Sequence, residues 1–205
     1  MKKIITAFLI SISTLAFAED HTSLLGKDLS NWTFITKEGE KDPSIAWKLK
    51  NGVLSTTGEP IGYLRTKENY KNYTLTYEWR WMPDSEKNNS GLLVHVGESG
   101  AAGVWPKCFE AQLMQGNAGD FWAIGESLEA TGENQKRRWI RITDPAEKPL
   151  GEWNKMTVKC SETEITVHVN GTLVNKGTKL STNQGAIGFQ SEGKTIEIRK
   201  VILKD

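Results

Sequence analysis

Alternating apolar and polar residues are the dominant pattern along the chain, and they predict β-strands. In residues 73–81 five large apolar side chains fall on one face, which is typical of a half-buried strand. Residues 108–114 alternate in the same way, with Phe109, Ala111 and Leu113 facing a core and Cys108, Glu110, Gln112 and Met114 on the other face. No segment shows a convincing amphipathic helical period, so the pattern favours an all-β protein.

Turn signals divide the remaining strands. Asn51-Gly52 and Asn170-Gly171 each stand between alternating runs, which is the strongest short-range signal for a β-hairpin. Further strands are expected near residues 91–96, 152–160, 164–169, 185–190 and 195–203. In the first of these, Leu92, Val94 and Val96 are expected to face the core, with His95 on the opposite face. Many short antiparallel strands with Gly and Asn punctuation indicate a β-sandwich.

The N-terminus predicts export. Lys2 and Lys3 precede an apolar run over residues 4–17 that ends in Ala16-Phe17-Ala18, which is typical of a signal peptide over residues 1–18. That run is too short to span a membrane, and a single exported domain over residues 19–205, periplasmic or extracellular, is expected. Removing two lysines changes the 26 basic and 25 acidic residues to 24 and 25, a net charge of −1 that does not favour nucleic-acid binding.

The two cysteines leave their redox state open. Cys108 and Cys160 could pair in an exported protein, or each could be a buried free thiol. With three histidines and no Cys-x-x-Cys pair, a zinc site is not indicated.

Polar residues opposite the predicted core faces are the candidates for chemistry. If the strands that carry Glu78 and Arg80, His95, and Glu110 and Gln112 are neighbours in one sheet, these side chains converge on one surface. Trp105 and Trp122 flank the third strand and its loop, and aromatic rings beside polar groups suit a sugar. The alternatives are a solvated strand face with a mobile loop, and a structural ion pair at Glu78 and Arg80.

The residue types favour one kind of reaction. The two carboxylates at two-residue spacing that sandwich-fold glucanases use are absent, because Gln112 and Met114 follow Glu110. A base with cationic and amide donors nearby instead suits removal of a proton next to a carbonyl group.

Seven short motifs occur in order along nearly the whole mature chain, and together they resemble one family. They are Leu-Gly-Lys-Asp-Leu-Ser-Asn-Trp (25–32), Tyr-Glu-Trp-Arg (77–80), Asn-Ser-Gly-Leu (89–92), Phe-Glu-Ala-Gln (109–112), Gly-Glu-Trp-Asn (151–154), Val-Asn-Gly (169–171) and Gly-Ala-Ile-Gly-Phe-Gln-Ser (185–191). The family is that of 3-keto-disaccharide hydrolases, also described as 3-keto-glucoside lyases and hydratases. The resemblance implies a concanavalin A-like jelly roll of two antiparallel sheets, with the site on the concave one.

The resemblance also implies the substrate and the reaction. In a sugar oxidised at carbon 3, the ketone acidifies the hydrogen on carbon 2, so a base can remove it and expel the group on carbon 1. Water then adds to the resulting glucal. The catalytic residues expected are Glu110, His95 and Glu78, and those expected to bind substrate are Arg80, Gln112, Lys107, Asn117, Asp120, Trp122 and Gln190.

The sequence also leads to expectations about cofactors and about alternative functions. No nucleotide cofactor and no metal site are predicted, although a divalent ion could polarise the keto oxygen through Glu78, Glu110 or His95. The alternative functions are a non-catalytic carbohydrate-binding module, since sandwich folds also serve as lectins, and an envelope protein without a sugar site.

Overall fold

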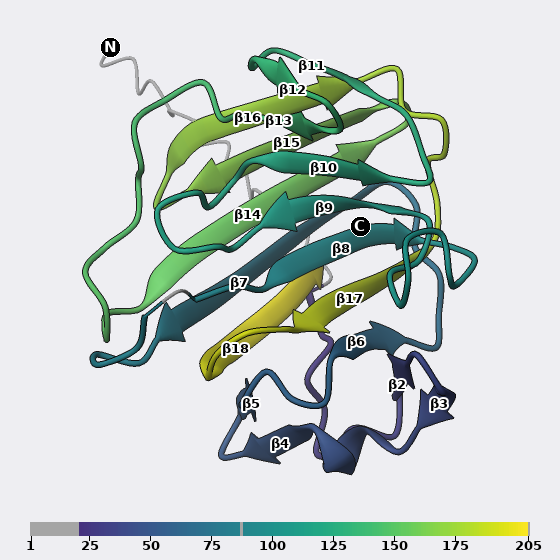
Figure 1. Ribbon diagram of the computed structural model, residues 1–205, viewed down its shortest axis with the longest axis vertical. Coiled ribbons are helices and arrows are strands. Elements are labelled where there is room, and N and C mark those ends of the chain that lie inside the picture. Colours follow the sequence, from purple (N-terminus) through teal and green to yellow (C-terminus); the bar gives the residue numbers. More distant parts are fainter. Residues whose placement is uncertain (1–20, 87, 205) are drawn as a thin grey trace, which may run out of the picture.

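Two antiparallel β-sheets form the protein. The computed structural model describes residues 21–86 and 88–204 (Figure 1). Sheet A contains β1 (His21–Ser23), β4 (Trp47–Lys50), β5 (Val53–Thr56), β7 (Tyr73–Trp81), β11 (Glu129–Ala130), β14 (Asn154–Ser161), β15 (Glu164–Val169), β16 (Thr172–Thr178) and β18 (Ile196–Lys204). Sheet B contains β2 (Trp32–Thr36), β3 (Gly39–Lys41), β6 (Gly62–Thr66), β8 (Gly91–Val96), β9 (Cys108–Gln112), β10 (Phe121–Ile124), β12 (Asn134–Gln135), β13 (Arg138–Trp139) and β17 (Ala186–Ser191).

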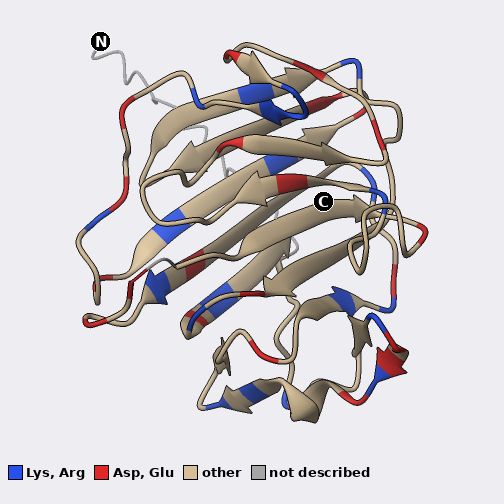
Figure 2. Ribbon diagram, in the orientation of Figure 1, with Lys and Arg blue, Asp and Glu red and all other residues tan. Residues whose placement is uncertain are grey.

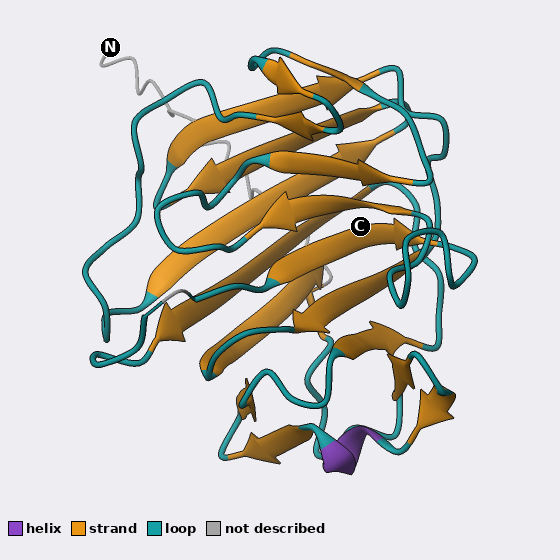
Figure 3. Ribbon diagram, viewed as in Figure 1, coloured by secondary structure: helices purple, strands orange, loops and turns teal. Residues whose placement is uncertain are grey.

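Helix is almost absent from the described residues. One turn of 3-10 helix over Pro43–Ile45 (η1) precedes β4, and strands and loops make up the rest (Figure 3). None of the helical segments in the described part of the chain is long and apolar enough to cross a bilayer. The predicted signal peptide, residues 1–18, lies outside the described residues.

The strand order brings distant segments together. Sheet A runs β11-β16-β15-β14-β7-β18-β5-β4, with β1 on β18, and sheet B runs β12-β13-β10-β9-β8-β17-β6-β2-β3. Both predicted hairpins are confirmed: Lys50 pairs with Val53, and Val169 with Thr172. Asn51 and Gly52 have φ angles of 52° and 74°, the left-handed conformation that a two-residue hairpin turn requires.

The main core lies between the sheets. The five apolar side chains of β7 point into it, as predicted, and alternate with half-buried polar residues. From sheet B, Phe109, Ala111 and Leu113 enter the same core, so the predicted alternation of residues 108–114 is confirmed. Glu110 and Gln112 therefore lie on the outer face of sheet B.

A second apolar cluster covers part of that outer face. It comprises Tyr63, Leu93, Val96, Cys108, Ile124 and Ala186, and is called here the outer cluster. Ala102, Val104 and Trp105 pack against it from the loop over residues 97–107, which connects β8 to β9. Sheet B thus carries apolar side chains on both faces, and the loop lies over the outer one.

The predicted face of His95 is wrong. At His95 the φ angle is 53°, and the pairing of β8 with β17 shifts register between Ala186 and Gly188. This irregularity turns the His95 ring into the interior, where its centroid lies 6.1 Å from those of Tyr73 and Phe109. The same shift places Val96 in the outer cluster instead of the main core.

Both cysteines are free and buried, which resolves the alternatives left open by the sequence. Cys108 belongs to the outer cluster of sheet B, whereas Cys160 lies in the main core on β14. Burial raises the pKa of the Cys160 thiol to about 12, and that of Cys108 well above its ordinary value. Neither thiol has the depressed pKa of a reactive cysteine.

Candidate functional site

A pocket of about 260 Å³ is hollowed into the outer face of sheet B. Strands β9, β10 and β17 contribute its floor, and the 97–107 loop and the turn between β12 and β13 contribute residues to its walls. The lining residues are Asn89, Ala102, Trp105, Glu110, Gln112, Met114, Trp122, Ala123, Ile124, Arg137, Gln190 and Glu192. Four of the ten residues expected in the site lie in it: Glu110, Gln112, Trp122 and Gln190.

Gly91 allows two of these side chains to converge. It lies on β8, between β9 and β17, and opposite Gln112. A Cβ atom at this position would stand 2.5 Å from Oε1 of Glu110 and 2.7 Å from Oε1 of Gln190. The Asn-Ser-Gly motif therefore requires glycine here because the Glu110 and Gln190 side chains occupy the space above the strand.

Glu110 is a carboxyl group with an unusual environment. Its side chain is on the pocket floor, and the residue is 4% exposed. Burial, reinforced by the charge of Glu192 and opposed by a hydrogen bond with Gln190, raises the pKa of Glu110 to about 8. Burial also raises the pKa of Glu192, which is half-buried in the same pocket. The charge of Glu192 thus favours the protonated form of Glu110.

The polar groups around the carboxyls can bind hydroxyls. Gln112 fixes its own position, because its Oε1 accepts hydrogen bonds of 2.8 Å from the backbone N–H groups of Leu113 and Met114. In contrast, Oδ1 of Asn89, Oε1 of Gln190 and Nε1 of Trp122 are buried without a hydrogen-bond partner among the described residues. Because Asn89, Gln190 and Trp122 line the pocket, these three atoms can form hydrogen bonds with a polar ligand there.

Aromatic rings complete the pocket. Trp122 pairs with Glu110 across β9 and β10, so its side chain stands next to the carboxyl on the same face. Trp105 lines the pocket from the 97–107 loop. Polar groups with aromatic side chains beside them are the arrangement that sugar rings require.

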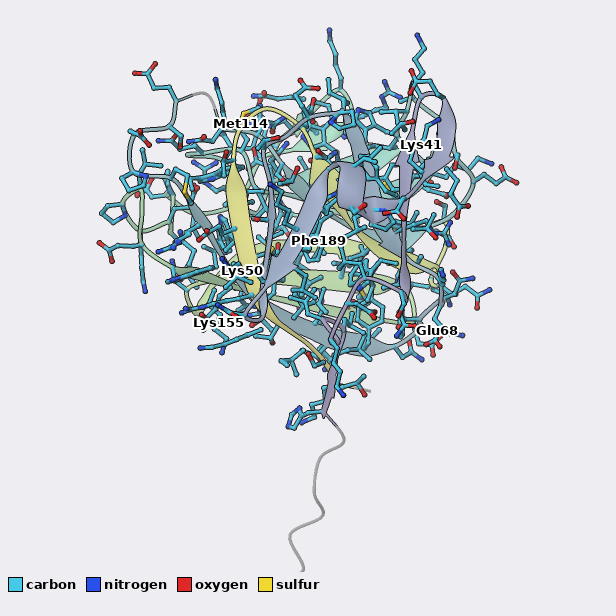
Figure 4. The ribbon with its side chains drawn as sticks, turned by 90° about the horizontal axis from the view of Figure 1, so that it is seen from below. Lys41, Lys50, Glu68, Met114, Lys155 and Phe189 are labelled. Atoms are coloured by element: carbon cyan, nitrogen blue, oxygen red, sulfur yellow. The ribbon has the colours of Figure 1, made fainter. Side chains whose placement is uncertain are left out.

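Glu78 and Arg80 do not join this pocket, and the predicted convergence with Glu110 is wrong. They lie on β7 in sheet A, where Glu78 pairs directly with Lys155 on the outer face of that sheet. Figure 4 shows Lys155 and the pocket residue Met114 on opposite sides of the buried Phe189. The two faces that alternation predicts to be polar are thus the two opposite outer faces of the sandwich.

Ion pairs with β18 account for both β7 residues. Glu78 accepts a 2.6 Å hydrogen bond from Arg199 and a 2.9 Å bond from Lys200. Burial acts to raise the pKa of Glu78, but these two cations outweigh it and hold the pKa below its ordinary value. Arg80 donates to Glu197 over 2.7 Å. Glu78 and Arg80 are thus in structural ion pairs, but with residues of β18 and not with each other as the alternative interpretation of the sequence expected.

His95 is also separate from the pocket. It is 2% exposed and lies among aromatic rings of the main core. Burial lowers the pKa of His95 to about 4, although a backbone hydrogen bond at Thr182 opposes the change. An imidazole that is enclosed and neutral at physiological pH is not placed to exchange protons with a ligand on the outer face of sheet B.

Three other predicted residues form ion pairs or hydrogen bonds near the pocket. Lys107 forms a 2.8 Å ion pair with Glu98 that closes the base of the 97–107 loop. Asp120 is fully buried and binds Arg138, whose Nη2 also donates to Oδ1 of Asn117 over 3.0 Å. Lys107, Asn117 and Asp120 are therefore not among the residues that line this pocket.

Sequence reasoning missed two charged residues of the pocket. Glu192 follows Gln190 by two positions, so extending the predicted strand of residues 185–190 would have placed both on one face. Arg137 lies in the turn between β12 and β13, where no periodicity identifies it. Figure 2 shows charged residues of both signs spread along the strands and loops.

A larger cleft of about 610 Å³ lies elsewhere, next to β2 and β4. Its tryptophans, Trp32 and Trp47, are no more than 2% exposed, and Asp28 and Asp42 accept hydrogen bonds from backbone N–H groups in their own turns. The smaller pocket is the better candidate because it contains the buried carboxyl. Within the described residues, no three His, Cys, Asp or Glu side chains gather closely enough to hold a metal ion.

Comparison with solved structures identifies the fold. A candidate glycosyl hydrolase from Parabacteroides distasonis ATCC 8503 has a TM-score of 0.66 and 21% identity, over 90% of this chain and 98% of that one. The carbohydrate-binding module CBM66 from Bacillus subtilis has a TM-score of 0.61 and 7% identity, over 87% and 98%. A β-1,3-1,4-glucanase from a mouse hindgut metagenome has a TM-score of 0.58 and 12% identity, over 92% and 99%. The predicted jelly-roll β-sandwich is confirmed.

Comparison by sequence identifies the family. No curated protein matches the chain. The family model of the 3-keto-alpha-glucoside-1,2-lyase-like domain matches residues 20–204, which is nearly the whole chain and confirms the resemblance seen in its motifs. This protein therefore belongs to the carbohydrate-active family of 3-keto-alpha-glucoside-1,2-lyase-like domains.

Proposed function

We propose that the protein is an exported enzyme that cleaves 3-keto-glucosides by general acid–base chemistry in the pocket on sheet B. The observation that carries this proposal is the pair of carboxyl groups, Glu110 and Glu192, in one pocket beside Trp122. The family supports a 3-keto-glucoside as substrate, because its description names that class of sugar.

One carboxyl group acts as the general acid and the other as the general base. Glu110, with a pKa of about 8, retains its proton at neutral pH and acts as the general acid. Glu192 is more exposed and acts as the base. Glu192 removes the hydrogen from carbon 2 next to the C3 ketone, the bond from carbon 1 to the leaving oxygen breaks, and Glu110 protonates that oxygen. The products are the free alcohol and a 3-keto-2-hydroxy-glucal.

The same pair can then hydrate the glucal. After elimination, Glu110 is ionised and Glu192 is protonated. When water replaces the alcohol, Glu110 takes a proton from the water as it attacks carbon 1, and Glu192 returns a proton to carbon 2. Both residues regain their starting protonation states, so hydrolysis of the glycoside needs no further proton carrier.

Turnover of a 3-keto-glucoside, followed by NMR or mass spectrometry of the products, tests the proposal. Glu110→Gln and Glu192→Gln should each lower kcat by about 100-fold or more, since general acid–base catalysis contributes factors of that size. Glu78→Gln is the matched control, because it makes the same change on the opposite outer face and should leave kcat unaltered. Equal turnover by wild type and Glu110→Gln would refute the assignment.

A non-catalytic carbohydrate-binding domain is the second candidate. It is favoured by the tryptophans that line the pocket and by the likeness in fold to CBM66. This function predicts saturable binding of unoxidised glycans without turnover, and loss of that binding in Trp122→Ala. Isothermal titration of wild type and variant, with product analysis of the same samples, separates the two functions.

A further inference from the structure

The carboxyl pair leaves one requirement of the proposed reaction unmet. Removing the hydrogen from carbon 2 moves an electron pair toward the ketone, so negative charge develops on the oxygen at carbon 3. Glu110 and Glu192 are not available to stabilise that charge, because Glu110 donates its proton to the leaving oxygen and Glu192 acts as an anionic base. A cation or a set of hydrogen-bond donors must stand near this oxygen.

Arg137 is the one cation among the described residues that line the pocket. The cations expected from the sequence are committed elsewhere: Arg80 is on the opposite face with Glu197, and Lys107 is paired with Glu98. We propose that Arg137 binds the C3 oxygen and stabilises the enolate, and that the buried Asp120–Arg138 pair positions it. This inference rests on the proposed function.

The backbone of Arg137 is held at a tight turn. Gln135 pairs with Arg138 across β12 and β13, so Lys136 and Arg137 form a two-residue connection. The carbonyl oxygen of Arg137 accepts a hydrogen bond of 3.2 Å from the N–H group of Ala123 on β10. Arg137 is an exposed residue, so its backbone position depends on these contacts and on those of its neighbours in the chain.

Arg138, the next residue, provides the anchor. Its Nε and Nη2 donate to the same oxygen of Asp120, Oδ2, over 2.8 Å and 2.6 Å. The other oxygen, Oδ1, accepts from the backbone N–H group of Arg141 over 2.9 Å. Asp120 is fully buried, and charge-assisted bonds in such a place hold a fixed geometry. Asp120 and Arg138 are therefore positioning residues for Arg137.

Turnover of a 3-keto-glucoside by Arg137→Gln is the first test. We expect kcat to fall by about 100-fold, which is the effect of removing one oxyanion donor in other enzymes. Lys136→Gln is the matched control, since it removes the adjacent cation of the same turn without changing the pocket lining. Added guanidinium ion should restore part of the activity of Arg137→Ala and none of that of Glu110→Gln.

A double-mutant cycle tests the positioning role. Asp120→Asn should lower kcat in wild type but should change it little in the Arg137→Gln background, because the group that it positions is then missing. Arg138→Lys, which keeps the charge and loses the two-bond contact, provides a second variant if Asp120→Asn does not fold. Melting temperatures of all variants identify losses that come from unfolding.

The outcomes separate this inference from the proposed function. If Arg137→Gln keeps full activity, Arg137 does not stabilise the enolate, while the carboxyl chemistry stands. If Asp120→Asn and Arg138→Lys lower kcat by the same factor in wild type and in Arg137→Gln, these two residues do not position Arg137. If wild type consumes no 3-keto-glucoside, the proposed function fails, and the role of Arg137 fails with it.

Discussion

Replacing Glu110 by Gln should stabilise the protein at neutral and alkaline pH while it lowers kcat by about 100-fold or more. In the folded protein Glu110 keeps its proton up to a pKa of about 8, whereas in the unfolded chain it ionises near its ordinary 4.5. Between these two values the folded state binds more protons than the unfolded state, so the free energy of unfolding falls as pH rises. Gln is uncharged and nearly isosteric, so the variant lacks this pH dependence.

The magnitude follows from the two pKa values. Each pH unit between 4.5 and 8 lowers the wild-type free energy of unfolding by about 1.4 kcal/mol through this group. Relative to wild type, Glu110→Gln should gain about 3 kcal/mol at pH 7 and about 5 kcal/mol above pH 8. At pH 5 the gain should be below about 1 kcal/mol.

Urea unfolding followed by tryptophan fluorescence measures this difference, because the chain contains eight tryptophans. Midpoints and slopes at pH 5, 7 and 8.5 give the free energies by linear extrapolation. Glu78→Gln is the control of opposite sign, since the pKa of Glu78 is lowered and its charge stabilises the folded state at neutral pH. A difference between Glu110→Gln and wild type that does not change from pH 5 to 8.5 would show that Glu110 is ionised in the folded protein.

Three further substitutions test other parts of the structure. Gly91→Ala should lower kcat/KM by about 100-fold, because its methyl group would stand 2.5 Å from Oε1 of Glu110 and displace the carboxyl; an unchanged kcat/KM would mean that the carboxyl can move freely. His95→Asn, which suits the positive φ angle, should remove one acid-induced loss of stability. Measured by urea titration as the difference from His95→Asn, wild type should lose about 3 kcal/mol between pH 6.5 and 4, since the unfolded state binds the proton first. Arg80→Gln should leave turnover within about twofold of wild type, as expected for an ion pair outside the pocket, and a large loss of kcat at an unchanged melting temperature would place Arg80 in the site.

Alternation predicts which side of a strand is polar, but it cannot say which outer face of a sandwich that side belongs to. Glu110 and Glu78 both alternate with core residues, and both point away from the core as expected. They nevertheless lie on opposite sides of the molecule because β9 and β7 belong to different sheets. Strand order depends on long-range pairing, for which one sequence carries no local signal.

Alternation also fails where a strand is irregular. The positive φ angle at His95 reverses the parity of the residues after it, and no turn residue marks the position. In contrast, alternation placed Gln112 correctly because β9 is regular up to the pocket. Arg137 was missed because a turn residue has no period, and its role depends on a buried ion pair that only the folded chain assembles.

The outer cluster holds a wall of the pocket without using the core that joins the two sheets. The 97–107 loop packs on side chains that lie outside the main core, so the sheets would stay joined if this loop were exchanged for another. A library of loops that preserves the apolar contacts at Val104 and Trp105 could therefore alter which sugars are accepted without remaking the scaffold. This makes the β8–β9 connection the natural place to engineer selectivity in the protein.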